Sequence, residues 1–176
     1  LGIGGITTIQ IKRIYSKNIL DLVLTGNQGD IMKESMKVAK TVCLNYISKY
    51  FKNIKINKQE YGIHIHCPNG GTPKDGPSAG SGITLGIISF ITKKKIRNDF
   101  AITGEIDLDG NVIQIGGLHS KLNGAKSAGV TTVLCPKMNE QDYINIINKD
   151  PTLIDNTFKV LFISNIHEVV EYMLIK

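Results

Sequence analysis

The chain of 176 residues is 41% hydrophobic and 20% charged. Such proportions are typical of a globular protein, and this length is enough to bury a core in a single domain. No apolar run approaches the roughly 18–20 residues that cross a bilayer, so we expect a soluble chain without a membrane-spanning segment. The sequence begins at Leu1 without the pattern of a signal peptide, and we interpret it as a piece of a longer protein.

A net charge of +6 at pH 7 raises the question of nucleic-acid binding. The lysines are scattered, however, and the densest group, Lys93 to Lys95, lies at the end of a predicted helix. Cations are stabilised at the carboxyl end of a helix by its macrodipole, so this group has a structural explanation. Basic residues without a recognisable pattern are weak evidence, and we do not expect this chain to bind nucleic acid.

Three cysteines, Cys43, Cys67 and Cys135, are widely spaced and odd in number. They argue against a disulfide framework and for a reducing compartment. His64 and His66 share one face of a predicted strand beside Cys67, a pattern that could belong to a metal site. A zinc site needs further ligands and no second cluster is visible in the sequence, so we expect no metal site.

The first half of the chain predicts two strands, a long helix and a third strand. Strands are predicted over residues 6–14 and 20–25, followed by a turn at 26–29. Asp30 is the expected cap of the long helix. The apolar positions of this helix fall near helical spacing: Ile31, Met32, Met36, Ala39, Val42, Cys43, Tyr46 and Ile47. A strand over 61–67 then leads through a loop rich in proline and glycine to a helix that starts at Ser78.

The second half mixes strands and helices without strict alternation. Segments 101–106 and 111–115 flank Asp107-Leu-Asp-Gly110, the signature of a β-hairpin turn. A helix over 121–128 ends at Gly129, a strand covers 131–135, and a helix covers 140–147. A strand over 159–163 and a terminal helix capped by Asn165 complete the chain. We expect one domain over residues 1–176 of the α+β class, with mixed sheets packed against helices.

Ser78 lies between helix-breaking residues and a run of small ones. Pro73, Gly76 and Pro77 precede it, and the small residues 79–82 lead into the apolar run 83–91. This pattern places Ser78 at the tip of a loop and at the start of a helix. The first backbone N–H groups of a helix have no intrahelical partner, so they can stabilise a developing oxyanion.

Several interpretations of this loop compete. A phosphate-binding loop is excluded, because Pro77-Ser78 stands where Lys-Ser/Thr is required and proline has no N–H to offer. A serine that only caps the helix remains open. A Ser-His-Asp triad also remains open, although there is no Gly-x-Ser-x-Gly elbow. Its base would be one of the four histidines: His64, His66, His119 or His167.

The remaining interpretation is a Ser–Lys dyad, in which Lys121 takes the proton of Ser78. A free lysine titrates near ~10.4, so a useful base at neutral pH needs a pKa lowered by roughly 3 units, or about 4 kcal/mol. Burial can supply that shift, and the first turn of a helix also disfavours a cation, but a nearby carboxylate would undo it. We therefore expect Asp75 and Glu105 to be turned away from the Lys121 nitrogen or paired elsewhere.

The segment Pro73-Lys-Asp-Gly-Pro-Ser-Ala-Gly80 resembles the signature octapeptide of the proteolytic domain of ATP-dependent Lon proteases. Further segments resemble the same family in the same order: Leu24–Ser35, Ile63–His66, Thr103–Glu105 and Ile113–Lys121. The resemblance covers nearly the whole chain. One departure is His119-Ser120, which stands where the family usually has a Lys-Glu pair before its catalytic lysine.

The resemblance implies a serine endopeptidase that hydrolyses unfolded or damaged proteins through an acyl-enzyme. Ser78 would be the nucleophile and Lys121 the general base, while Thr103 would orient the lysine by hydrogen bonding. Backbone amides around Ser78 would stabilise the oxyanion. The signature loop would support the site through four further residues: Asp75, Gly76, Pro77 and Ala79. The family uses no metal or histidine for this chemistry, so no cofactor is expected in this chain.

The resemblance also implies partners that these residues do not contain. An AAA+ ATPase module would bind ATP and Mg and thread the substrate, and the parent protein would form a homohexameric ring. Reduced cysteines fit the bacterial cytoplasm or the mitochondrial matrix, and a composition rich in Lys, Asn and Ile slightly favours the matrix. The alternative function is a catalytically silent domain that serves an ATPase as a structural or interaction module. The presence of both Ser78 and Lys121 in matching context favours the enzyme.

Overall fold

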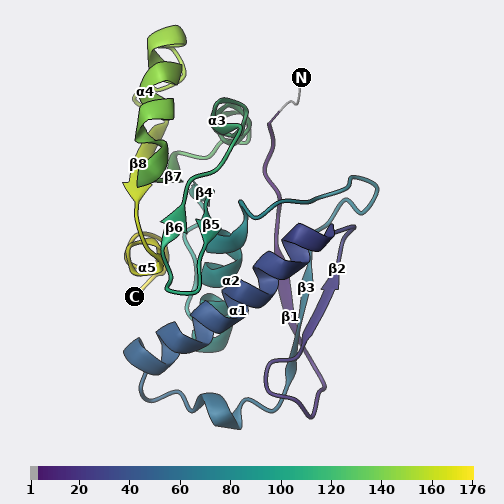
Figure 1. Ribbon diagram of the computed structural model, residues 1–176. Coiled ribbons are helices and arrows are strands. Elements are labelled where there is room, and N and C mark those ends of the chain that lie inside the picture. The colour runs from purple at the N-terminus through teal and green to yellow at the C-terminus, as the bar shows by residue number, and fades with distance from the viewer. Residues whose placement is uncertain (1–3) are drawn as a thin grey trace.

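The structure is a computed structural model that describes residues 4–176 (Figure 1). Its helices are α1 (Asp30–Tyr50), α2 (Gly80–Thr92), α3 (Leu118–Ser127), α4 (Glu140–Lys149) and α5 (Ile166–Met173), with short 3-10 turns η1 (Ile56–Lys58) and η2 (Lys137–Asn139). Its strands are β1 (Gln10–Ile14), β2 (Leu22–Thr25), β3 (Gly62–His66), β4 (Phe100–Ile102), β5 (Glu105–Ile106), β6 (Val112–Ile113), β7 (Thr132–Pro136) and β8 (Lys159–Ile163). The α+β class predicted from the sequence is confirmed.

The first sheet has the strand order β1–β3–β2, with β1 antiparallel and β2 parallel to the central strand. Ile63 and Ile65 of β3 are fully buried, whereas His64 and His66 lie on the opposite, more open face. This alternation is that of a strand with one face on the core. The loop that carries Ser78 leaves from the carboxyl end of this central strand and passes over the first turn of α1 (Figure 1).

The second sheet has the order β4–β7–β8 and is parallel throughout. Its central strand β7 is buried along its whole length, as expected of the middle of a parallel sheet. The sequence predicts one strand over 101–106, and this prediction is wrong. The chain leaves the parallel sheet after Ile102 and begins the separate β5–β6 hairpin at Glu105. Thr103 and Gly104 lie between these two strands, and their backbone groups form hydrogen bonds with Leu134, Ser78 and Ser81.

The larger hydrophobic core joins the first sheet, α1, α2 and α5. The predicted apolar face of α1 is buried with one exception, since Ile31 is 53% exposed. Ser35 is buried instead and its hydroxyl donates to Pro77 O at 3.4 Å. The loop before Ser78 therefore packs over the first turns of α1. The spacing of apolar residues does not predict this contact, because it is made by a polar side chain.

A second core lies between α3, β7, β8 and the segment after α4. Its buried residues come from α3, β7 and the loops beside them: Ile115, Leu118, Leu122, Ala125, Val133, Cys135, Leu153 and Phe158. The terminal helix α5 begins after Asn165, whose side chain accepts a hydrogen bond from the Glu168 N–H at 3.0 Å. That predicted N-cap is confirmed.

Element boundaries differ from the predictions mainly at the start of the chain. The strand predicted over 6–14 begins only at Gln10, and the described residues before it, 4–9, have no regular structure. No helix within residues 4–176 is long and apolar enough to cross a membrane. All three cysteines are buried free thiols, as expected from their number and spacing.

Candidate active site

Ser78 lies in the turn immediately before α2 and is half-buried. The amides of the first two residues of α2 are occupied, because they donate to Pro77 O and Gly104 O, both at 3.0 Å. Within residues 4–176, the amides of Ser78 and Ala79 have no backbone acceptor. These two N–H groups are therefore the ones available to an oxyanion at the start of the helix. The helix begins two residues later than predicted.

The carbonyl of Ser78 ties this turn to the segment between β4 and β5. It accepts hydrogen bonds from the Gly104 N–H at 2.8 Å and from the Thr103 hydroxyl at 3.4 Å. In the opposite direction, the Ser81 hydroxyl donates a hydrogen bond to Gly104 O at 2.9 Å. Gly104 is closely packed, since a Cβ there would lie 2.4 Å from the side chain of Val112, which would have to shift. Thr103 was expected to orient Lys121, and in this structure its hydroxyl contacts the Ser78 carbonyl.

Lys121 lies in the first turn of α3. The residue before this helix, Gly117, has a left-handed backbone conformation with φ of +67°. Burial is the main influence on its amine and lowers the pKa, while the neighbouring Cys135 raises that pKa by a smaller amount. Burial also raises the pKa of Cys135 to about 12, so this neighbour is a neutral thiol at physiological pH. Lys121 therefore has the direction of pKa shift that a general base requires.

One stretch of backbone supports both candidate residues. The Thr103 N–H donates to Leu134 O in β7 at 3.1 Å. The next residue of that strand, Cys135, neighbours Lys121 and raises the pKa of its amine. Thr103 also contacts Ser78. Within residues 4–176, the Ser78 hydroxyl and the Lys121 amine form no hydrogen bond with each other. The proposed dyad is therefore not engaged in this structure. Resting geometries of catalytic pairs are often longer than their reacting geometries.

Asp75 is engaged by the amino terminus of α1. Its carboxylate accepts hydrogen bonds from the N–H groups of Gly76 at 2.8 Å and Met32 at 2.9 Å. These contacts lower the pKa of Asp75, Gly76 first and Met32 second. Neither Asp75 nor Glu105 is among the groups that shift the pKa of Lys121, in agreement with the expectation from the sequence. The chain also turns at Gly76, whose φ of +94° favours glycine.

The four histidines are paired away from Ser78. Both His64 and His66 contact the Thr25 hydroxyl, at 2.8 and 2.7 Å. His119 lies 3.4 Å from the Asp150 carboxylate on the surface. His167 contacts the hydroxyl of Tyr46 at 2.9 Å. These contacts give no support to a histidine base. Among residues 4–176 there is also no group of three or more His, Cys, Asp and Glu side chains placed to hold a metal ion.

The sequence reasoning missed a contact beside Lys121. Gly4 and Gly124 touch backbone to backbone: a Cβ on Gly124 would lie 2.3 Å from the carbonyl carbon of Gly4. A Cβ on Gly4 would lie 1.5 Å from the carbonyl oxygen of Ser120, the residue before Lys121. The start of the described chain thus crosses α3 one turn from the candidate base. A glycine inside a predicted helix is the sequence signal of such a close approach.

Comparison with known proteins identifies the family. Residues 2–176 match the family model of the Lon protease (S16) C-terminal proteolytic domain. The chain is 40% identical to a Lon protease homolog of Acanthamoeba polyphaga mimivirus, over 97% of this chain and 17% of that protein. It is 38% identical to a Lon protease of Fusobacterium nucleatum, over 99% of this chain and 22% of that protein. A mitochondrial Lon protease homolog of Drosophila melanogaster is 40% identical over 84% of this chain and 14% of that protein. The chain spans between 14% and 22% of the length of these relatives, and it belongs to the family of Lon protease (S16) C-terminal proteolytic domains.

Proposed function

We propose that this chain is a serine endopeptidase domain in which Ser78 is the nucleophile and Lys121 the general base. One observation carries most weight: Lys121 has a pKa lowered by burial and neighbours Cys135 of β7, the strand that also binds Thr103, which in turn contacts Ser78. A lysine shielded from water and away from carboxylates can accept a proton from a serine hydroxyl. Membership of the Lon proteolytic family supports the same assignment.

In the proposed reaction, the neutral amine of Lys121 takes the proton of Ser78 as Oγ attacks the carbonyl carbon of a peptide bond. The oxyanion accepts hydrogen bonds from the amides of Ser78 and Ala79. Collapse breaks the C–N bond, the leaving amine takes the proton back from Lys121, and an ester remains on Ser78. A water then loses a proton to Lys121, hydrolyses the ester and restores the hydroxyl. This sequence of steps uses no metal or cofactor.

The remaining members of the signature loop support this site in the proposal. Gly76 provides the left-handed turn, and Asp75 fastens the loop to α1. Pro77 accepts the first hydrogen bond of the turn with its carbonyl, and Ala79 offers its amide. Thr103 positions Ser78 through the carbonyl of that residue.

Extended polypeptide is the substrate that fits this arrangement. Residues 5–8 are exposed, precede β1 and make no backbone hydrogen bonds within the described chain. They follow Gly4, which touches α3 next to Lys121. Free backbone N–H and C=O groups of such a segment can pair with a substrate strand, so we propose that an unfolded protein binds there.

The wider assembly is also a proposal. The relatives named as Lon proteases are about five times longer than the part that this chain matches. We propose that this domain, spanning residues 1–176, acts with an AAA+ module that binds ATP and Mg, in a homohexameric ring that encloses the serines. Bacterial and mitochondrial relatives both occur. The bacterial cytoplasm or the mitochondrial matrix is therefore the proposed compartment.

A serine-directed fluorophosphonate tests the chemistry directly. We expect one adduct, at Ser78, which Ser78→Ala abolishes and the matched control Ser127→Ala leaves intact, since Ser127 is exposed at the end of α3. Lys121→Met should slow labelling at least about 100-fold, in the range of general-base catalysis. The labelling rate of the wild type should rise with pH through the lowered pKa of Lys121, which lies below 10.5.

The rival function is a catalytically silent interaction domain of an ATPase. It predicts no adduct at Ser78 even in the longer protein with ATP and an unfolded substrate present. Unchanged peptide hydrolysis in Lys121→Met would instead reject the dyad while leaving a peptidase with a different base.

A further inference from the structure

The ammonium group of Lys74 is enclosed by backbone carbonyls. Its Nζ donates to the carbonyl oxygens of Asn69 at 2.8 Å, Thr72 at 3.0 Å and Gly26 at 3.1 Å. An ammonium has three N–H donors, and here all three have an acceptor. Two of these carbonyls belong to the loop before Ser78, and the third belongs to the turn between β2 and α1. One side chain therefore joins two segments that are far apart in the sequence.

The backbone of Lys74 binds the same turn. Its N–H donates to Asn27 O at 3.0 Å, and its carbonyl accepts from the Gly29 N–H at 2.7 Å, which forms a short parallel bridge with Gln28 between them. The turn itself is fixed from the core side, because the buried amide of Gln28 donates to Thr25 O at 2.6 Å. Lys74 is thus anchored at three points on a firmly held turn.

The loop around Lys74 needs such an anchor. Residues 68–77 contain three glycines and three prolines and lie mostly at the surface. A surface loop with glycines loses much conformational entropy when it is ordered. Lys74 precedes Ser78 by four residues, and the next residue, Asp75, is the one that caps α1. Fixing Lys74 therefore limits where the Ser78 hydroxyl can lie.

We propose that Lys74 is a positioning residue: its ammonium, held by the carbonyls of Gly26, Asn69 and Thr72, sets the loop conformation in which Ser78 reacts. This proposal rests on the proposed peptidase function and assigns a second, different role to a lysine of the site. Lys121 moves protons, whereas Lys74 holds geometry. Misplacement of a reacting group by about 1 Å can slow a reaction by about 100-fold, so the loss of the anchor should be visible in the rate.

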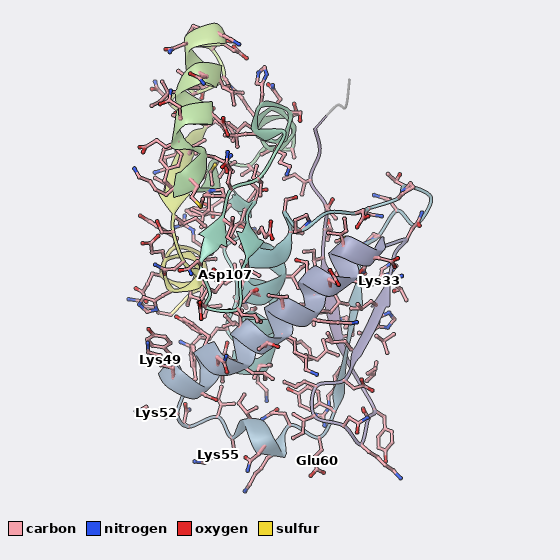
Figure 2. The ribbon with its side chains drawn as sticks, in the orientation of Figure 1. Lys33, Lys49, Lys52, Lys55, Glu60 and Asp107 are labelled. Carbon is pink, nitrogen blue, oxygen red and sulfur yellow. The ribbon has the colours of Figure 1, made fainter. Side chains whose placement is uncertain are left out.

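The first measurement compares Lys74→Met with wild type in the full chain. The matched control is Lys52→Met, which removes an exposed lysine just beyond the far end of α1, about 30 Å along the helix axis from the loop (Figure 2). Amide hydrogen exchange reports the anchor without any need for activity. We expect the Gly29 and Met32 amides, which bind the loop, to exchange at least tenfold faster in Lys74→Met only. The Cys67 amide, bound to Thr25 O in the sheet, should not change.

The second measurement is the rate of fluorophosphonate labelling at Ser78 as a function of pH. We expect Lys74→Met to be slower by about 10- to 100-fold at every pH, with the midpoint of the pH profile unmoved, because the base is still Lys121. A shifted or lost midpoint would make Lys74 part of the proton transfer and overturn a positioning role.

Chemical rescue separates the cation–carbonyl contact from general damage to the loop. Lys74→Ala leaves space for a small alkylammonium. Ethylammonium, which has three N–H donors, should restore labelling at least threefold, and tetramethylammonium at the same ionic strength should not, because it carries the charge without a donor. Equal effects of the two salts would overturn the proposal.

The outcomes distinguish this inference from the proposed function. Wild-type Ser78 that stays unlabelled even in the longer protein with ATP and an unfolded substrate, together with faster exchange in Lys74→Met, would reject the peptidase while keeping Lys74 as the anchor of the loop. Normal exchange in Lys74→Met would overturn the anchor whatever the labelling rate. Faster exchange with labelling at the wild-type rate would overturn the link from Lys74 to Ser78.

Discussion

The carboxylate of Asp75 accepts a hydrogen bond from the backbone N–H of Met32 at 2.9 Å, and this contact joins the loop before Ser78 to the first turn of α1. Asp30 was the predicted cap of α1, and this prediction is wrong: Gly29 is the N-cap residue and has no side chain to satisfy that amide. A residue from 43 positions further along the chain therefore supplies the cap. The same contact holds the carboxylate at the start of α1, and Asp75 is not among the groups that shift the pKa of Lys121.

Removal of this carboxylate should loosen the loop and slow the chemistry. We expect Asp75→Ala to reduce Ser78 labelling by about tenfold, through misplacement of the nucleophile. Asp75→Asn should have a smaller effect, because its side-chain oxygen still accepts from Met32 but carries no charge for the helix terminus. Labelling of Asp75→Ala at the wild-type rate would mean that the docked loop is not the reactive one.

The lowered pKa of Asp75 also predicts how the docked loop responds to acid. Hydrogen bonds from Gly76 and Met32 are the main causes of the lowering. A carboxylate with a lowered folded pKa stabilises the docked state above the ordinary value of 3.8, and this contribution is lost as the pH falls through the folded pKa. The Met32 amide should therefore stay protected against hydrogen exchange at pH 4 and lose protection only below it, while Asp75→Ala removes the protection at all pH values.

The Asp75 carboxyl group packs against Gly29, and a substitution of Gly29 tests this contact. A Cβ on Gly29 would lie 2.3 Å from the Asp75 carboxyl carbon, and with φ of −72° the backbone there accepts alanine without strain. Gly29→Ala should therefore push the carboxylate off the helix and slow labelling to within about twofold of Asp75→Ala. The double variant should be no slower than either single one, as expected of two changes that act through one contact. Additive losses would show that Gly29 acts by another route.

Much of the fold follows from local patterns in the sequence. The buried face of α1, the Asn165 cap and the β8 strand over 159–163 were predictable because helical spacing, cap chemistry and apolar runs are read from neighbouring residues. The proposed pairing of Ser78 with Lys121 rests on the resemblance to a family. No local pattern brings together two residues on different elements.

The contacts that build the site were not predictable for the same reason. Asp75 reaching Met32, Lys74 reaching Gly26, and Gly4 crossing α3 at Gly124 are all long-range in the sequence. The division of segment 101–106 has a similar cause. Thr103 still donates to Leu134 of β7, but the Gly104 N–H donates to the Ser78 carbonyl, 26 positions earlier in the chain, and leaves the sheet there.

Thr103→Val tests whether the Thr103 hydroxyl positions Ser78. The hydroxyl is buried and donates to the Ser78 carbonyl at 3.4 Å, but that carbonyl also accepts from Gly104 at 2.8 Å. The loss of one weak bond should cost about 1 kcal/mol of unfolding free energy at most and slow labelling a few-fold. Thr84→Val is the matched control, because its buried hydroxyl donates to Gly80 O within α2 and not to Ser78. Equal slowing by the two variants would reject a positioning role for Thr103.

Lys121 should destabilise the fold at neutral pH, and Lys121→Met should reverse this. Burial lowers the pKa of Lys121 in the folded chain, so between that pKa and 10.5 the unfolded chain binds the proton more tightly. The wild-type free energy of unfolding therefore rises with pH across this window. Lys121→Met removes the penalty, and we expect its Tm to lie about 1–3 °C above that of wild type at pH 7. The difference should shrink as the pH rises towards and past 10.5, because above that value the lysine is neutral in both states. Thermal unfolding of both proteins at several pH values measures it, and an equal or lower Tm for Lys121→Met at pH 7 would mean that Lys121 is held as a stabilised cation, which is unsuited to a general base.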